Sequence, residues 1–120
     1  MNVPAYLRSN PRINLAWIVG CAATIFALSA TPAEDIPARL TPYSVILHAI
    51  EYSALGFLAY PYAGGRMPFL AAVAASALYG VSDELHQLFV PGRVCSAEDA
   101  AVDLLGSAFG AAASKLWGRL

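Results

Sequence analysis

The sequence predicts an all-α fold, a small polytopic membrane bundle of four transmembrane helices that forms one domain over residues 1–120. Composition is the first reason: apolar residues make up 58% of the chain and charged residues 12%, whereas an ordinary soluble domain carries roughly 25% charge. Length is the second, because 120 residues suffice for one domain only. The third is that apolar residues gather in long runs, separated by short segments rich in proline and glycine.

The first predicted helix covers residues 13–30, at the start of a stretch that holds no charge as far as residue 33. Its length suits a membrane-crossing helix. A signal peptide is the alternative interpretation, since Arg8 and Arg12 precede the run. Apolar cores of signal peptides usually have about 7 to 15 residues, so the greater length favours a retained helix.

The second and third predicted helices follow a proline-rich loop. The second covers residues 43–62 and is interrupted by His48 and Glu51. The third covers residues 67–89, with Pro68 at its start, where proline is well tolerated. At 1.5 Å per residue it would measure about 35 Å, which is enough to cross a bilayer.

The fourth predicted helix covers residues 99–117 and has the shortest apolar stretch of the four. Asp99 and Asp103 lie in its first turns, where carboxylates favour the positive end of a helix. Either Ser96 or Glu98 is expected to cap it, and the sequence leaves that choice open.

Orientation follows from the Lys and Arg residues in the loops. Four crossings place the N-terminus, the 63–66 turn and the C-terminus on one side of the membrane. That side carries Arg8, Arg12, Arg66, Lys115 and Arg119. The other side carries Arg39 and Arg93. Both termini are therefore expected in the cytoplasm, and loops 31–42 and 90–98 are expected to face outward.

Polar residues near the predicted helices gather at one level, just below the outer surface. Helical spacing places those of each helix on one face, so three helices are expected to direct them at a common cavity. The residues concerned are His48, Glu51, Tyr52, Asp83, Glu84, Gln87, Asp99 and Asp103. The Gly106-xxx-Gly110 spacing on the fourth helix predicts close helix packing beside them.

The charges of this cavity do not balance, because five carboxylates face only Arg93 and two histidines, His48 and His86. So many negative charges do not all remain ionised in a site of low dielectric constant. Three solutions stay open: some carboxylates are protonated, the histidines are protonated, or a cation binds. A divalent cation is thus a candidate cofactor, with its identity and ligands unspecified.

The residue types suggest roles within the cavity. His48, Glu51 and Glu84 are the candidate catalytic residues, since histidine and carboxylates serve acid–base chemistry; the alternative for His48 and Glu51 is a hydrogen-bonded pair that ties the second helix to the third. The candidate binding residues are Tyr52, Asp83, Gln87, Arg93, Asp99 and Asp103. Arg93 suits an anionic group such as a phosphate, or it neutralises nearby carboxylates. Asp99 and Asp103 either belong to the site or stabilise the positive N-terminal end of the fourth helix; the helix end is favoured for Asp99 and the site for Asp103.

Three sequence segments resemble one known family. They read His48-x-x-Glu51-Tyr52-x-x-Leu55-Gly56, Asp83-Glu84-x-x-Gln87-x-x-x-Pro91-Gly92-Arg93 and Ser96-x-x-Asp99-x-x-x-Asp103-x-x-Gly106. In this order they resemble the VanZ-like membrane proteins over about residues 44–115. The chain departs from the family pattern at two places: the family often has Asn at the position of Asp103, and an Asp-Lys pair where this chain has Ser44 and Val45.

The resemblance implies a multi-pass protein of the bacterial cytoplasmic (inner) membrane. The family is named for low-level resistance to teicoplanin, a lipoglycopeptide antibiotic that acts at the outer membrane surface. The main functional hypothesis is therefore a site that engages an envelope lipid or a lipophilic antibiotic at the outer leaflet. The alternative is a membrane-embedded acid–base or metal-assisted enzyme acting on a lipid-linked envelope substrate, and a third interpretation is a purely structural polar plug.

Partners other than membrane lipids and such a ligand are not indicated. Nucleic acid is excluded because the net charge is −1 and no basic face exists. The oligomeric state stays open.

Overall fold

A computed structural model describes all 120 residues, and every regular element in it is helical. Two short 3-10 segments, η1 (Ala33–Asp35) and η2 (Ala38–Tyr43), occupy the first long loop. The helices are α1 (Val3–Ser9), α2 (Pro11–Ser29), α3 (Ser44–Tyr62), α4 (Pro68–Gln87) and α5 (Ala97–Trp117). The four long helices begin and end within two residues of the ranges expected from the sequence.

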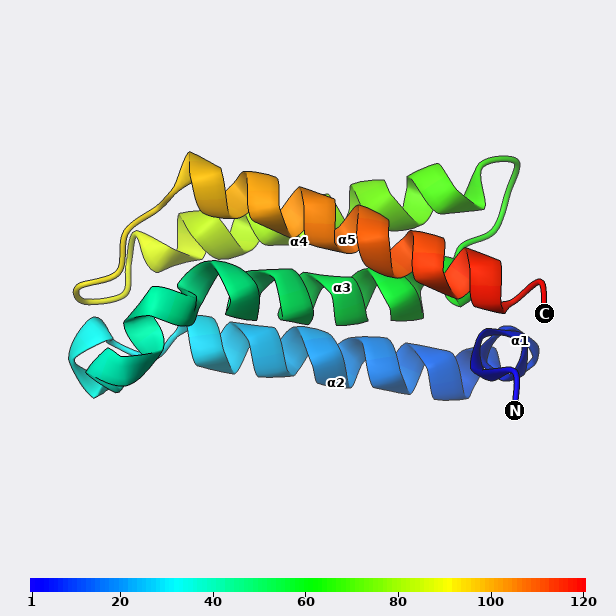
Figure 1. The fold of residues 1–120 in the computed structure, drawn as a ribbon, viewed down its shortest axis with the longest axis horizontal. Helices are drawn as coiled ribbons and strands as arrows, with labels where there is room; N and C mark the ends of the chain where they lie inside the picture. The colour runs from blue at the N-terminus through cyan, green and yellow to red at the C-terminus, as the bar shows by residue number, and fades with distance from the viewer.

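The four long helices lie side by side along the longest dimension of the molecule, which measures 43 × 23 × 22 Å (Figure 1). The segments that join α2 to α3 and α4 to α5 lie at one end. Both termini, α1 and the loop between α3 and α4 lie at the opposite end. The four long helices thus alternate in direction along the length of the molecule. We call the end with the α2–α3 and α4–α5 connections the loop end.

Helix α1 was not predicted, and its capping explains why so short a helix forms. The side chain of Asn2 accepts a hydrogen bond from the Ala5 N–H at 3.0 Å, which satisfies a free donor of the first turn. The same side chain donates to the carbonyl of Trp117 at 3.1 Å. Leu7 is buried. α1 is therefore fixed across the ends of the other helices by contacts remote in sequence.

The interior of the molecule is unusually polar and its surface unusually apolar. Ten buried residues are polar or charged, against nine buried apolar ones. Large apolar side chains project outward instead, among them Leu78 (68% exposed), Leu105 (68%) and Phe109 (71%). This is the inverse of the usual distribution in a water-soluble domain.

Only α2 has both the length and the apolar composition of a membrane-crossing helix. The sequence predicted four membrane crossings. The structure has four long helices, but the composition supports a crossing for only one of them. The other three carry ionisable or hydroxyl side chains on their buried faces, for example His48 on α3 and Asp103 on α5. These side chains lower the mean hydropathy without changing the outward surface.

Helix α3 is central, and its closest approach is to α5. A Cβ atom added at Gly110 would overlap the carbonyl oxygen of Ser53, and one added at Gly56 would overlap that of Ser107. Glycine at both positions lets the two backbones touch, as expected for small residues between membrane helices. This contact sets the distance across which the polar side chains of α3 and α5 meet.

Candidate polar site

His48 on α3 forms the main polar link to α5. Its Nδ1 atom lies 2.8 Å from Oδ1 of Asp103, and its Nε2 atom lies 3.9 Å from Oδ2 of Asp99. These are the only ion pairs in the molecule. The bond from His48 therefore reaches α5, whereas the sequence suggested a link to the third long helix through a pair with Glu51.

Tyr52, one turn after His48, supplies the link to α4. Its hydroxyl group donates to Oδ2 of Asp83 at 3.3 Å, and its side chain is fully buried. The spacing that placed His48 and Tyr52 on one face of α3 is thus confirmed, with each side chain contacting a different neighbouring helix.

Glu84 is held by the loop that leads into α5. The backbone N–H of Ser96 donates to its Oε2 atom at 3.0 Å. The hydroxyl oxygen of the same serine accepts from the N–H of Asp99 at 3.2 Å, which makes Ser96 the cap of α5 and leaves Glu98 exposed in the first turn. Asp99 lies in the capped first turn, half-buried and beside His48.

Three side chains from three helices converge at the centre of the site, and we call them the central triad: His48, Glu84 and Asp103. One nitrogen or carboxylate oxygen from each lies within 4.8 Å of those of the other two. All three residues are buried. Gly80 makes room for them, since a Cβ atom there would lie 3.1 Å from Oδ2 of Asp103.

Several buried polar atoms around the central triad have no hydrogen-bond partner. They are Oδ1 of Asp83, Oε1 of Glu84, Nε2 of Gln87 and Oδ2 of Asp103. An unpaired buried polar group costs about 1–3 kcal/mol, and more when it is charged. Four of the eight buried side-chain atoms without a partner belong to these residues, which makes the site a candidate for binding a ligand.

Other predicted site residues make no hydrogen bond with the triad. Glu51 is half-buried, with no hydrogen bond to another side chain or to the backbone. Arg93 donates from Nη1 to the carbonyls of Leu28 (3.3 Å) and Thr31 (2.9 Å), at the end of α2. It therefore pairs with no carboxylate, and its remaining guanidinium nitrogens have no protein partner.

His86 also points away from the triad, because its ring stacks on Phe26 of α2 with the ring centroids 4.5 Å apart. The buried carboxylates of the site are thus left with His48 as their only basic partner. The protein brings fewer basic groups to these carboxylates than the sequence suggested.

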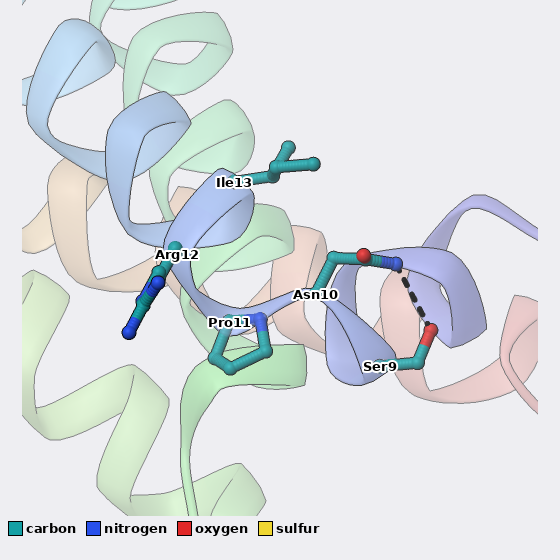
Figure 2. Close-up of a pocket in the computed structure, with 5 residues that line it drawn as sticks. All are labelled: Ser9, Asn10, Pro11, Arg12 and Ile13. Atoms are coloured by element: carbon teal, nitrogen blue, oxygen red, sulfur yellow. Dashed lines mark hydrogen bonds between the residues drawn. The ribbon is translucent and has the colours of Figure 1, made fainter.

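Two hollows on the surface do not contain this cluster. One of about 340 Å³ lies at the α1–α2 junction and is lined by residues 9–13, where Asn10 donates to Ser9 (Figure 2). A second, of about 590 Å³, is an apolar groove between α3 and α5, lined among others by Ile50 and Phe109. The central triad is instead enclosed between helices.

Asn14 is a buried polar residue that was not among the residues predicted to matter. With its amide oriented by its neighbours, it donates to the Leu58 carbonyl at 2.9 Å and accepts from the Tyr62 N–H at 3.0 Å. Both groups belong to the turn of α3 that contains Pro61, whose ring removes one N–H and disturbs the adjacent bonds. The sequence does contain a signal for this contact: Asn14 lies in the first apolar run, and Pro61 lies in the second.

Comparison with known proteins gives one match. A family model described as VanZ/LLP1 matches residues 7–118, a longer stretch than the one that carries the sequence resemblance. No curated protein and no solved structure matches the chain.

Proposed function

Since the chain belongs to the VanZ/LLP1 family, whose members are membrane-associated, we propose that it is a four-pass protein of the bacterial cytoplasmic membrane. Its buried acidic site would engage the polar group of an envelope lipid, or of a lipoglycopeptide antibiotic, at the outer leaflet. The observation that carries this proposal is the set of unpartnered buried oxygens beside a single histidine. Oxygens of this kind accept hydrogen bonds, so they call for an amine or hydroxyl group on the ligand.

Multiple crossings are supported by the surface and the dimensions. Large apolar side chains are exposed on α4 and α5, for example Leu85 and Phe109, just as large apolar side chains are exposed on α2. The three later helices have 19, 20 and 21 residues, which gives about 28 to 32 Å at 1.5 Å per residue. That span matches the roughly 30 Å hydrocarbon core of a bilayer.

The outward position of the site is supported by the fold and the charges. The site residues belong to the start of α3, the end of α4 and the start of α5, which adjoin the loop end. The loops at that end carry Arg39 and Arg93, whereas five basic residues belong to segments at the end with the termini. The positive-inside rule then places the termini in the cytoplasm. Ligands that act at the outer membrane surface would meet the site from its own side.

Glu51→Gln tests the proposal, because Glu51 lies one turn from His48 and has no hydrogen-bonded partner. The substitution keeps its shape and removes its charge. In a teicoplanin-susceptible host, expression of the native protein is expected to raise the minimum inhibitory concentration, and Glu51→Gln to reduce that rise partially. Binding of fluorescent teicoplanin to the protein in nanodiscs should weaken in parallel.

Glu98→Gln is the matched control, since Glu98 is exposed at the same end of the molecule. Its protection and binding should equal those of the native protein at equal expression. A native protein that neither protects nor binds would contradict the proposal. Loss of expression or thermal stability in Glu51→Gln, with binding retained per folded molecule, would favour a structural plug.

A membrane-embedded enzyme is the second candidate, and the 2.8 Å contact between His48 and Asp103 favours it. A carboxylate in this position orients an imidazole ring and stabilises its protonated form. His48 would then act as the base toward a lipid-linked substrate. Complete loss of protection in Glu51→Gln with folding intact, together with a modified lipid detected by mass spectrometry, would support this alternative over simple binding.

A further inference from the structure

We propose that the central triad, His48, Glu84 and Asp103, is a binding site for a divalent transition-metal ion. The three residues come from three helices, and one donor atom of each lies within 4.8 Å of the others. Ligand bonds to Zn²⁺ are about 2.0–2.2 Å long, so donors on one ion lie roughly 3 to 4 Å apart. The triad is therefore close to the required spacing and would have to contract slightly around an ion.

Unpartnered oxygens provide a separate reason for an ion. Oε1 of Glu84 and Oδ2 of Asp103 are buried without any hydrogen bond, in side chains that are 2% and 0% exposed. Each of these side chains has its other oxygen engaged: Oε2 of Glu84 by the Ser96 N–H, and Oδ1 of Asp103 by His48. The free oxygens are therefore held in place by the bonded ones, as ligating carboxylates are in metal sites.

The charge of the site gives a third reason. Asp83, Glu84 and Asp103 are buried together, and no Lys or Arg side chain pairs with any of them. Arg93, the nearest basic residue in the sequence, is bonded to carbonyl groups at the end of α2. A divalent ion supplies two positive charges where the protein supplies at most one, through His48.

The donor set selects the kind of ion. One imidazole nitrogen with two carboxylates suits Zn²⁺, Mn²⁺ or Fe²⁺, whereas Mg²⁺ and Ca²⁺ prefer oxygen ligands alone. Asp99, with Oδ2 3.9 Å from Nε2 of His48, is placed to complete the coordination. The order of affinities for such a site is Zn²⁺ above Mn²⁺. The ion would use the oxygens that the proposed function assigns to a ligand, so this inference rests on that site, but uptake of the metal itself requires protein groups only.

Titration with metal alone tests the site. Tag-free protein, stripped with EDTA and returned to detergent without chelator, is titrated with Zn²⁺ and with Mn²⁺ by isothermal calorimetry. We expect one Zn²⁺ per chain, weaker uptake of Mn²⁺, and no response to Ca²⁺. Glu84→Gln and His48→Gln should each weaken Zn²⁺ binding by about tenfold or more, and Glu98→Gln should leave it unchanged.

Two results would overturn the site: no saturable uptake of Zn²⁺ by the native protein, or uptake that Glu84→Gln and His48→Gln leave unaltered. If both variants fail to fold, the native protein decides alone. Zn²⁺ must then raise its thermal midpoint, EDTA must reverse the rise, and Ca²⁺ must not reproduce it. Teicoplanin binding measured on the EDTA-stripped protein shows separately whether the proposed function holds.

Discussion

Asp103 shows most clearly how single residues define the site. It is fully buried on α5, contacts His48 on α3, and lies against Gly80 of α4. The sequence predicted its place in the cavity, because its spacing from Gly106 and Gly110 put all three on one face of a helix. The partner of His48 could not be predicted, since helical periodicity gives the face of a helix but not which neighbour that face meets.

Two substitutions at Asp103 separate the role of its charge from that of its hydrogen bond. In metal-free protein, Asp103→Asn is expected to be at least as stable as the native chain. Its amide oxygen still accepts from His48, and one uncompensated negative charge is removed. Asp103→Leu leaves the His48 ring without its partner and is expected to cost about 1–3 kcal/mol. Thermal unfolding in detergent measures both, and equal losses in the two variants would show that the charge itself holds His48.

At the scale of elements, the contact between α3 and α5 determines the architecture. The sequence predicted the small-residue face of the fourth long helix, and the buried Gly106, Ser107, Gly110 and Ser114 confirm it. It did not predict that α3 carries the complementary surface, because Gly56 and Ser53 are small residues among many in an apolar run. α1 escaped prediction for a similar reason: its stability comes from Asn2 and from a distant carbonyl of α5.

Gly110→Ala tests this helix contact. The added methyl group would overlap the carbonyl oxygen of Ser53, so the helices must move apart, and overpacking of this kind typically costs about 1–3 kcal/mol. Gly20→Ala on α2 is the matched control, because nothing lies within 4 Å of its added Cβ atom. The control should be neutral or stabilising by up to about 1 kcal/mol, since alanine favours helices. Unfolding by SDS measures the difference, and equal stability of both variants would contradict the close contact.

At the scale of the whole molecule, the bundle is polar inside and apolar outside. The helical spacing of the polar residues predicted the polar interior, because it placed them on faces of three helices directed at a common cavity. Composition supports α2 alone as a crossing helix, since the buried polar faces of the other three reduce their mean hydropathy. The direction in which the polar side chains point depends on how the helices pack together, and it cannot be read from the hydropathy of a single helix.

The native cysteines make the orientation measurable. Cys95 is exposed at the loop end, and Cys21 lies within α2. In a Cys21→Ser protein, a membrane-impermeant maleimide is expected to label Cys95 from outside intact cells, because the proposed topology places the loop end outside. With both native cysteines replaced by serine, Gly64→Cys places a thiol in open space at the opposite end. That thiol should react only after permeabilisation, and the reverse pattern would show the opposite orientation.

The bond between Asn14 and α3 has a consequence for how the protein is made. In lipid, an amide side chain finds no water, and leaving it unpaired is costly. Asn14 finds its partners, the Leu58 carbonyl and the Tyr62 N–H, only when α3 lies beside α2. During synthesis α2 emerges first, so its amide lacks those partners until more than forty further residues have followed. In the proposed four-pass topology, the two helices are therefore best inserted into the bilayer as a pair.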